Sequence, residues 1–160
     1  MAKLDSGYEE EEAAELLRAV GPAFRKLRRG VLNLVENPIS HKDMSRTLVL
    51  AVVEEGTAEP EGEITVGAVA EALAVDPSVS SRMVSDCITA GYLTRAASQR
   101  DGRRTVLRLS PEGIGLLGRF REQQEKAFLH ITAGWSERDR LDFARLMLKY
   151  VDSIGQLQKG

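Results

Sequence analysis

The arginines between Ser78 and Ser110 are the residues of this chain whose chemistry is easiest to interpret. Six arginines there stand against Asp86 and Asp101, so the stretch carries a net charge of +4. Guanidinium groups form paired hydrogen bonds with phosphates and with guanine in the major groove of DNA. The stretch therefore predicts a surface that binds nucleic acid. Its arginines are Arg82, Arg95, Arg100, Arg103, Arg104 and Arg108.

A helix is expected to present the first part of this surface. Asp76 and Pro77 predict its start, because aspartate suits an N-cap and proline has its φ preset for the first turn. Gly91 predicts its end, since glycine is favoured just past a helix C-terminus. The side expected to face the core carries Val79, Met83, Val84 and Cys87. The side expected to be exposed and to contact DNA carries Ser78, Ser80, Ser81, Arg82 and Ser85.

A two-stranded hairpin is expected to present the second part. Residues 92–96 and 105–109 are typical of strands, and Asp101-Gly102 between them is a strong hairpin signal. Thr65 is a suitable N-cap for a shorter helix before Asp76, and Ile64 is expected to pair with the hairpin. The order from Ile64 to Ser110 is thus helix, turn, helix and hairpin, which describes a winged helix-turn-helix that inserts one helix into a major groove. The loop of this wing adds four candidate DNA contacts: Gln99, Arg100, Arg103 and Arg104.

The flanking segments read as helices. Residues 8–35 have apolar side chains at helical spacing, with a kink or break expected at Gly21-Pro22. Residues 43–55 form another expected helix, and residues 111–155 two more, of which Ser136 and Asp139 cap the second. The buried side of the helix at 43–55 is expected to carry Leu48, Val49, Val52 and Val53. The last helix has two apolar stripes, which indicates packing from two directions, the second against another subunit.

Composition sets the broad class. A chain of 160 residues fits one domain, here mainly α with a small β-wing. The total charge of −2 does not oppose DNA binding, because a local patch produces the field that attracts phosphate. No apolar run is long enough for a membrane span, and the N-terminus lacks the pattern of a signal peptide. With a single cysteine as well, we expect a cytoplasmic protein without membrane contact.

The segment VDPSVSSRMVSDCITAGYLTR, followed by RDGRRTVLRLSPEG, resembles the MarR family of bacterial winged-helix transcription regulators. The resemblance covers most of the chain and implies a homodimer whose first and last helices interlock. It places Ser78, Ser81 and Arg82 on the DNA-facing positions of the recognition helix. It makes Arg103 the wing arginine that enters the minor groove, and assigns Asp101 and Arg95 structural roles in the wing.

The sequence departs from the family pattern at three positions. Ser98 stands where the family usually has an aspartate at the start of the wing loop, so the resemblance alone does not establish that the wing is rigid. Cys87 stands where the family has leucine. Asp86 adds a negative charge to the recognition helix, which would either weaken phosphate contacts or orient Arg82 across one helical turn.

The function implied is that of a sequence-specific regulator, a repressor that binds a pseudo-palindromic site as a homodimer and is released by a small-molecule effector. Residues 1–160 would then form one domain, with a dimerisation region at 8–35 and 111–155 and a DNA-binding lobe at 43–110. Double-stranded DNA and a second copy of the chain are the expected partners. The sequence identifies no residue that would bind the effector.

Two alternatives remain at this stage. The wing and helices could form a protein-interaction module, although interface cores favour aromatic and apolar anchors over serine and arginine. Cys87 could be a redox sensor, although its apolar position predicts a packing role. An enzyme is not expected, because the sequence has no phosphate-binding loop, nucleophile motif or paired acid and base. No cofactor or metal is expected, since His41 and His130 are isolated.

Overall fold

The computed structural model describes residues 7–30, 40–58 and 62–157, without the side chains of 28–30 and 41. The chain divides into two compact units, residues 1–40 and 41–160. The described residues of the first unit form one helix, α1 (Glu10–Gly30), which runs through Pro22 without a break. Of the two outcomes expected there, a kink or a break, the break is therefore wrong, and residues 31–35 of the expected helix lie outside the described residues. The apolar side chains of α1 are largely exposed, Leu17 by 75%.

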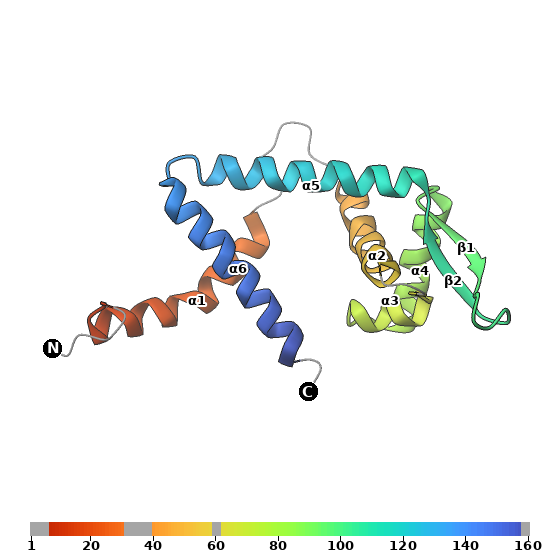
Figure 1. Ribbon diagram of the computed structural model, residues 1–160, viewed down its shortest axis with the longest axis horizontal. Coiled ribbons are helices and arrows are strands. Elements are labelled where there is room, and N and C mark those ends of the chain that lie inside the picture. The colour runs from red at the N-terminus through yellow and green to blue at the C-terminus, as the bar shows by residue number, and fades with distance from the viewer. Residues whose placement is uncertain (1–6, 31–39, 59–61, 158–160) are drawn as a thin grey trace. The chain divides into compact units, whose positions relative to one another are not determined.

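The second unit contains the other helices and both strands (Figure 1). A small antiparallel sheet pairs Leu93 with Leu109 and Ala97 with Thr105, and Ile64 forms the expected bridge to Leu107. The architecture confirms a mainly α fold with a β-wing. In chain order the elements are α2 (His41–Thr57), α3 (Val66–Ala72), α4 (Pro77–Thr89), β1 (Leu93–Ala97), β2 (Thr105–Leu109), α5 (Pro111–Ile131) and α6 (Glu137–Leu157).

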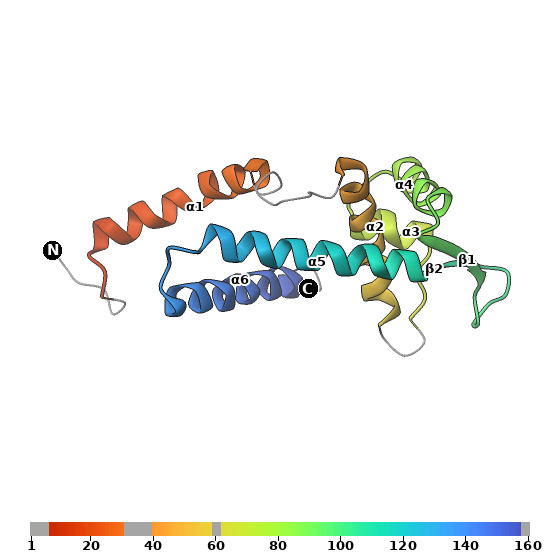
Figure 2. The same cartoon turned by 90° about the horizontal axis from the view of Figure 1, so that it is seen from above.

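The core of this unit lies where α2, α3, α4 and the sheet gather around the N-terminal part of α5 (Figure 2). Helix α2 contacts α3, α4, α5 and β2, so a wide sector of its surface is buried. The predicted burial of Leu48 is wrong, because this side chain is 53% exposed. Leu50 is fully buried although it lies outside the predicted apolar side, since several elements contact α2. The largest fully buried side chains include Leu50, Leu93, Leu107, Val49, Val53, Val69, Val84 and Val106.

Helices α5 and α6 are both started by serine caps. The hydroxyl of Ser110 accepts from the amide of Gly113 at 3.0 Å, and that of Ser136 accepts from the amide of Asp139 at 3.1 Å. At the junction between the two helices, Phe143 stacks on Phe128 and meets Trp135 edge-on. No described residue of α6 is buried, and the stripe that includes Leu141, Leu148 and Val151 is more than half exposed at each of these three residues. Among those residues, no helix has the length and apolar character of a membrane span.

Candidate nucleic-acid interface

Helix α4 begins and ends where the sequence predicts, with one difference in its cap. Asp76 is the N-cap, but its carboxylate makes no capping hydrogen bond. The main-chain carbonyl of Asp76 instead accepts from the amides of Val79 and Ser80 at 2.9 and 3.0 Å. Gly91 follows the helix with a φ of +80°, a left-handed conformation that glycine adopts without strain.

The exposed face of α4 carries most of the predicted DNA contacts. Ser78, Ser81, Arg82 and Ser85 are all exposed. Ser80 is not, since it is fully buried and its hydroxyl donates to the carbonyl of Val66 at 2.9 Å. Its assignment to the DNA-facing side is therefore wrong, because Ser80 lies on the same side of the helix as Val84 and Cys87. Its hydroxyl joins α4 to α3.

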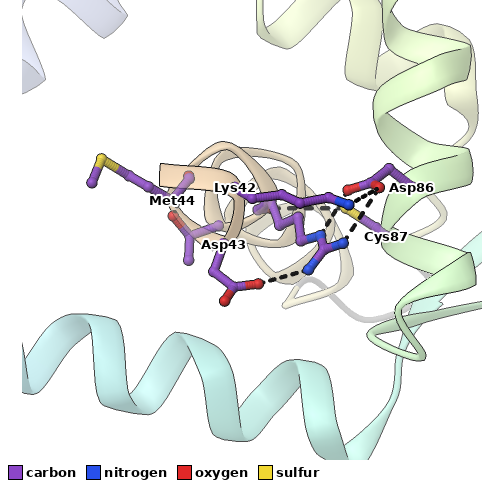
Figure 3. A network of polar contacts seen from close by, with 7 residues as sticks. Lys42, Asp43, Met44, Asp86 and Cys87 are labelled. Atoms are coloured by element: carbon purple, nitrogen blue, oxygen red, sulfur yellow. Dashed lines mark hydrogen bonds and ion pairs between the residues drawn. The ribbon is translucent and has the colours of Figure 1, made fainter. Parts of the chain in front are cut away.

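Asp86 is held by helix α2 rather than by Arg82. Nε of Arg46 donates to Oδ2 of Asp86 at 2.7 Å, and Nη2 of Arg46 to Oδ1 at 3.3 Å. Lys42, 3.4 Å from the same carboxylate, completes the cluster (Figure 3), and Arg46 also bonds Asp43 at 2.7 Å. The hydrogen bond from Arg46 holds the pKa of Asp86 below its usual value, and the same bond raises the pKa of Arg46.

This cluster decides the charge that α4 presents. Two cations of α2 neutralise the carboxylate of Asp86, so the positive charge of Arg82 stands beside the exposed serines. A hollow of about 240 Å³ next to α4 is lined by Ser45, Arg46, Arg82, Met83 and Asp86. The guanidinium group of Arg46 also lies 5.5 Å from the centre of the Tyr92 ring, so Arg46 contacts the segment that follows α4 as well as Asp86.

Replacing Asp86 with asparagine is expected to destabilise the fold by about 1 kcal/mol, a modest value because the carboxylate is partly exposed to solvent. The folded-state pKa of Asp86 lies below its ordinary value of 3.8, so the contribution is complete above that pH and is lost as the pH falls through the folded-state value. Urea unfolding at pH 7 and pH 3 measures this. Asp142→Asn, whose partners Arg138 and Arg145 are exposed on the same helix, should change little. Equal stability of Asp86→Asn and wild type at pH 7 would contradict the role of this cluster.

The wing loop is a compact turn rather than a two-residue hairpin. The amide of Ser98 donates to the carbonyl of Arg104 at 2.9 Å, and the amide of Arg104 donates to the carbonyl of Asp101 at 2.8 Å. Gly102 does not adopt the left-handed conformation that a tight Asp-Gly hairpin requires. The four predicted contacts in this loop are all exposed, namely Gln99, Arg100, Arg103 and Arg104.

Of the two residues predicted to support the wing, Asp101 bonds the loop, whereas no wing contact of the Arg95 side chain is described. Oδ1 of Asp101 accepts from the amide of Arg103 at 3.1 Å, so Asp101 holds the loop through the main chain of an arginine. Arg95 lies in the middle of β1 opposite Leu107, with its side chain exposed. A structural role of Arg95 in the wing stays a prediction.

Glu63 is a residue of the wing that sequence reasoning missed. Ser98 is only 5% exposed, and its hydroxyl donates to Oε2 of Glu63 at 2.5 Å while the amide of Gln99 donates to Oε1 at 2.7 Å. The bond from Ser98 lowers the pKa of Glu63. The loop start is thus well bonded although position 98 lacks the aspartate that the family usually has there. The one signal in the sequence was that Glu63 precedes Ile64, which was expected to pair with the wing.

Cys87 and His130 lie outside this surface. Cys87 is fully buried, and burial raises the pKa of its thiol to about 11, so the reactive thiolate is scarce at neutral pH. This environment disfavours the redox-sensor hypothesis. His130 is exposed on α5, and His41 is the first residue of α2, with a side chain outside the described part of the chain. Among the described residues no group of three or more His, Cys, Asp or Glu side chains could hold a metal ion.

Comparison with known proteins identifies the same lobe. The model of the MarR family matches residues 43–104, which include most of α2, all of α3 and α4, and the wing loop. An HTH-type transcriptional regulator of Mycobacterium tuberculosis is 31% identical over 143 residues, which cover 88% of this chain and 92% of that protein. An HTH-type transcriptional regulator of Mycobacterium bovis shows the same identity and coverage.

Solved structures agree in fold over nearly the whole chain. A MarR family protein from Bacillus stearothermophilus matches with a TM-score of 0.63 at 20% identity, over 92% of this chain and 99% of that one. The PcaV transcriptional regulator of Streptomyces coelicolor matches with a TM-score of 0.58 at 23% identity, over 86% and 98%. BpsR of Bordetella bronchiseptica matches with a TM-score of 0.58 at 17% identity, over 82% and 98%. The relatives are regulators rather than enzymes, and this chain belongs to the MarR family of DNA-binding, winged helix-turn-helix transcriptional regulators.

Proposed function

We propose that this regulator is a homodimeric repressor that binds a pseudo-palindromic DNA site, with α4 as its recognition helix. The observation that carries the proposal is the exposed face of α4, where serines and Arg82 stand free of bulky side chains while α2 neutralises Asp86. Arginine at such a position can bond guanine, and serine can contact bases or phosphates. A protein-interaction module would instead present apolar anchors on this face.

The wing would contact the DNA beside the major groove that receives α4. Arg103 is the residue we assign to the minor groove, where a guanidinium group is attracted by the negative potential. Gln99, Arg100 and Arg104 would contact phosphates, which position the protein without reading sequence. The turn at Asp101–Arg104 supports this assignment, since it holds the loop through its main chain and leaves these side chains exposed.

Dimerisation would use the exposed apolar residues of α1 and α6. On α6, Leu141, Leu148 and Val151 are between 58% and 66% exposed. Large apolar faces of this kind mark interaction sites, and a homodimer buries the same face on both subunits. Residues 1–160 would then act as one domain, with 8–35 and 111–155 joining two lobes at 43–110. The two recognition helices would lie about 34–36 Å apart, one turn of DNA.

Release from DNA by a small molecule completes the proposal. In BpsR, DNA binding is regulated by 6-hydroxynicotinic acid. For the present chain we propose a small organic effector, with aromatic acids as the first class to test. Such a ligand would act by favouring a spacing of the two recognition helices that does not fit DNA. As a repressor, the protein would work in the bacterial cytoplasm.

Arg103→Ala is expected to weaken binding to the specific site by roughly tenfold, and to lower the slope of log K against log salt by about one for each phosphate that Arg103 contacts. Fluorescence anisotropy over a series of salt concentrations measures both quantities. Arg119→Ala is the matched control, because it removes the same charge from an exposed position on α5. Equal affinities of Arg103→Ala and Arg119→Ala at every salt concentration would remove Arg103 from the interface.

A further inference from the structure

Residues 63–66 connect the wing to both helices of the helix-turn-helix. Glu63 bonds the wing loop, and the carbonyl of Ile64 accepts from the amide of Leu107 in β2 at 2.8 Å. The hydroxyl of Thr65 caps α3 by accepting from the amide of Ala68. The carbonyl of Val66 accepts the hydroxyl of Ser80 from α4. This short segment therefore links the wing to α4, in addition to the direct chain connection from α4 to β1.

The contact between Glu63 and the loop uses both oxygens of one carboxylate. The hydroxyl of Ser98 donates to one oxygen and the amide of Gln99 donates to the other. The oxygen of Ser98 in turn accepts from the amides of Arg100 and Asp101 at 3.1 and 3.0 Å. A hydroxyl that donates to a carboxylate is a better acceptor, so the charge of Glu63 strengthens all of these bonds.

We propose that Glu63 is a positioning residue for DNA binding: its carboxylate fixes the wing loop, and so determines where Arg100, Arg103 and Arg104 stand relative to α4. The inference rests on the proposed contact of the wing with DNA. Glu63 does not touch DNA itself. It acts through Ser98 and the loop amides.

Whether DNA affinity rises or falls when the charge of Glu63 is removed separates a positioning role from simple charge repulsion. Glu63 is a negative charge close to a surface that binds a polyanion. Removing such a charge should strengthen DNA binding if charge alone mattered. Removing a positioning residue should weaken binding, because the wing arginines lose their fixed place and ordering them on DNA costs entropy.

Glu63→Gln is therefore expected to bind the specific site roughly tenfold more weakly than wild type, with a shallower salt slope. The glutamine keeps the size of the side chain but cannot accept from both donors. Glu71→Gln is the matched control, because Glu71 is exposed on α3 and its loss removes the same charge. That variant should bind as well as wild type or slightly better. Binding by Glu63→Gln as tight as by Glu71→Gln would overturn the proposal.

Moving the negative charge from position 63 to position 98 should restore DNA binding. Ser98→Asp alone places a second carboxylate against Glu63, and the repulsion should weaken DNA binding. In the double variant Glu63→Gln with Ser98→Asp, the aspartate can accept the loop amides and the glutamine can donate to it. The total charge then equals that of wild type, and affinity should return to within about threefold. A double variant that binds more weakly than both single variants would contradict the proposal.

Amide hydrogen exchange, measured in the absence of DNA, tests whether Glu63 anchors the wing loop. The amides of Gln99, Arg100 and Asp101 should exchange faster in Glu63→Gln than in wild type, while those of α4 should not change. Unchanged exchange at the three loop amides would overturn the inference even if DNA binding were lost. A wild-type protein that bound no DNA at low salt would instead refute the proposed function, and the exchange result would still decide the role of Glu63.

Discussion

Replacing Leu148 with glutamate is expected to make the protein monomeric and to lower its affinity for a two-fold symmetric site by at least about a hundredfold. Leu148 is 66% exposed on α6, a helix with no buried residue of its own among those described. In a dimer this side chain would be covered by the partner, where an unpaired carboxylate is costly. A monomer binds one half-site only, so the gain from two linked lobes disappears.

Sedimentation equilibrium measures the assembly, and fluorescence anisotropy measures DNA affinity. Gln156→Glu is the control, because it adds the same charge to α6 on the side opposite the apolar stripes. That variant should remain dimeric and bind DNA normally. Circular dichroism should show unchanged helix content in Leu148→Glu. A Leu148→Glu protein that stays dimeric and binds with wild-type affinity would exclude this face of α6 from the interface.

Gly113→Ala should destabilise the protein by about 2–3 kcal/mol, the cost of overpacking a site that cannot relax. A Cβ atom at Gly113 would lie 2.2 Å from the carbonyl oxygen of Tyr92. That oxygen is main chain and accepts from the amide of Ser110, whose hydroxyl caps the same helix and donates to Gly91. The first turn of α5 would have to move away from the end of α4, so the contact cannot be relieved by rotating a side chain.

Gly118 on the same helix provides the comparison. A Cβ atom there meets nothing within 4 Å, so Gly118→Ala should stabilise the fold by about 0.5–1 kcal/mol through helix propensity. Thermal and urea unfolding measure both variants. The two substitutions are chemically identical, and only the space around the Cβ differs. Equal effects of the two would mean that α5 does not approach Tyr92 as closely as the structure shows.

The features that could be predicted from sequence depend on neighbouring residues. Thr65 and Ser136 cap their helices as expected, because a cap needs only a hydroxyl and an amide three residues later. Gly91 ends α4 for a similarly local reason. The winged helix-turn-helix followed from the order of these elements, and the family resemblance added the assignment of residues to DNA.

The features that could not be predicted depend on residues distant in the sequence. The bonds of Asp86 with Arg46 and of Ser98 with Glu63 span 40 and 35 positions, so no local pattern contains them. Ser80 was misassigned because its hydroxyl suggested exposure, whereas a buried hydroxyl needs only one acceptor, here Val66. Each of these polar residues obtains its role from a partner on another element.

A binding selection on random DNA with the purified full-length protein tests the central claim most directly. We predict an enriched sequence with two-fold symmetry, whose half-sites are centred about 10 base pairs apart to match two recognition helices one turn of DNA apart. Binding to that sequence should fall steeply with salt. Enrichment of a single asymmetric element, or no enrichment at low salt, would contradict a dimer that reads DNA with α4 and the wing.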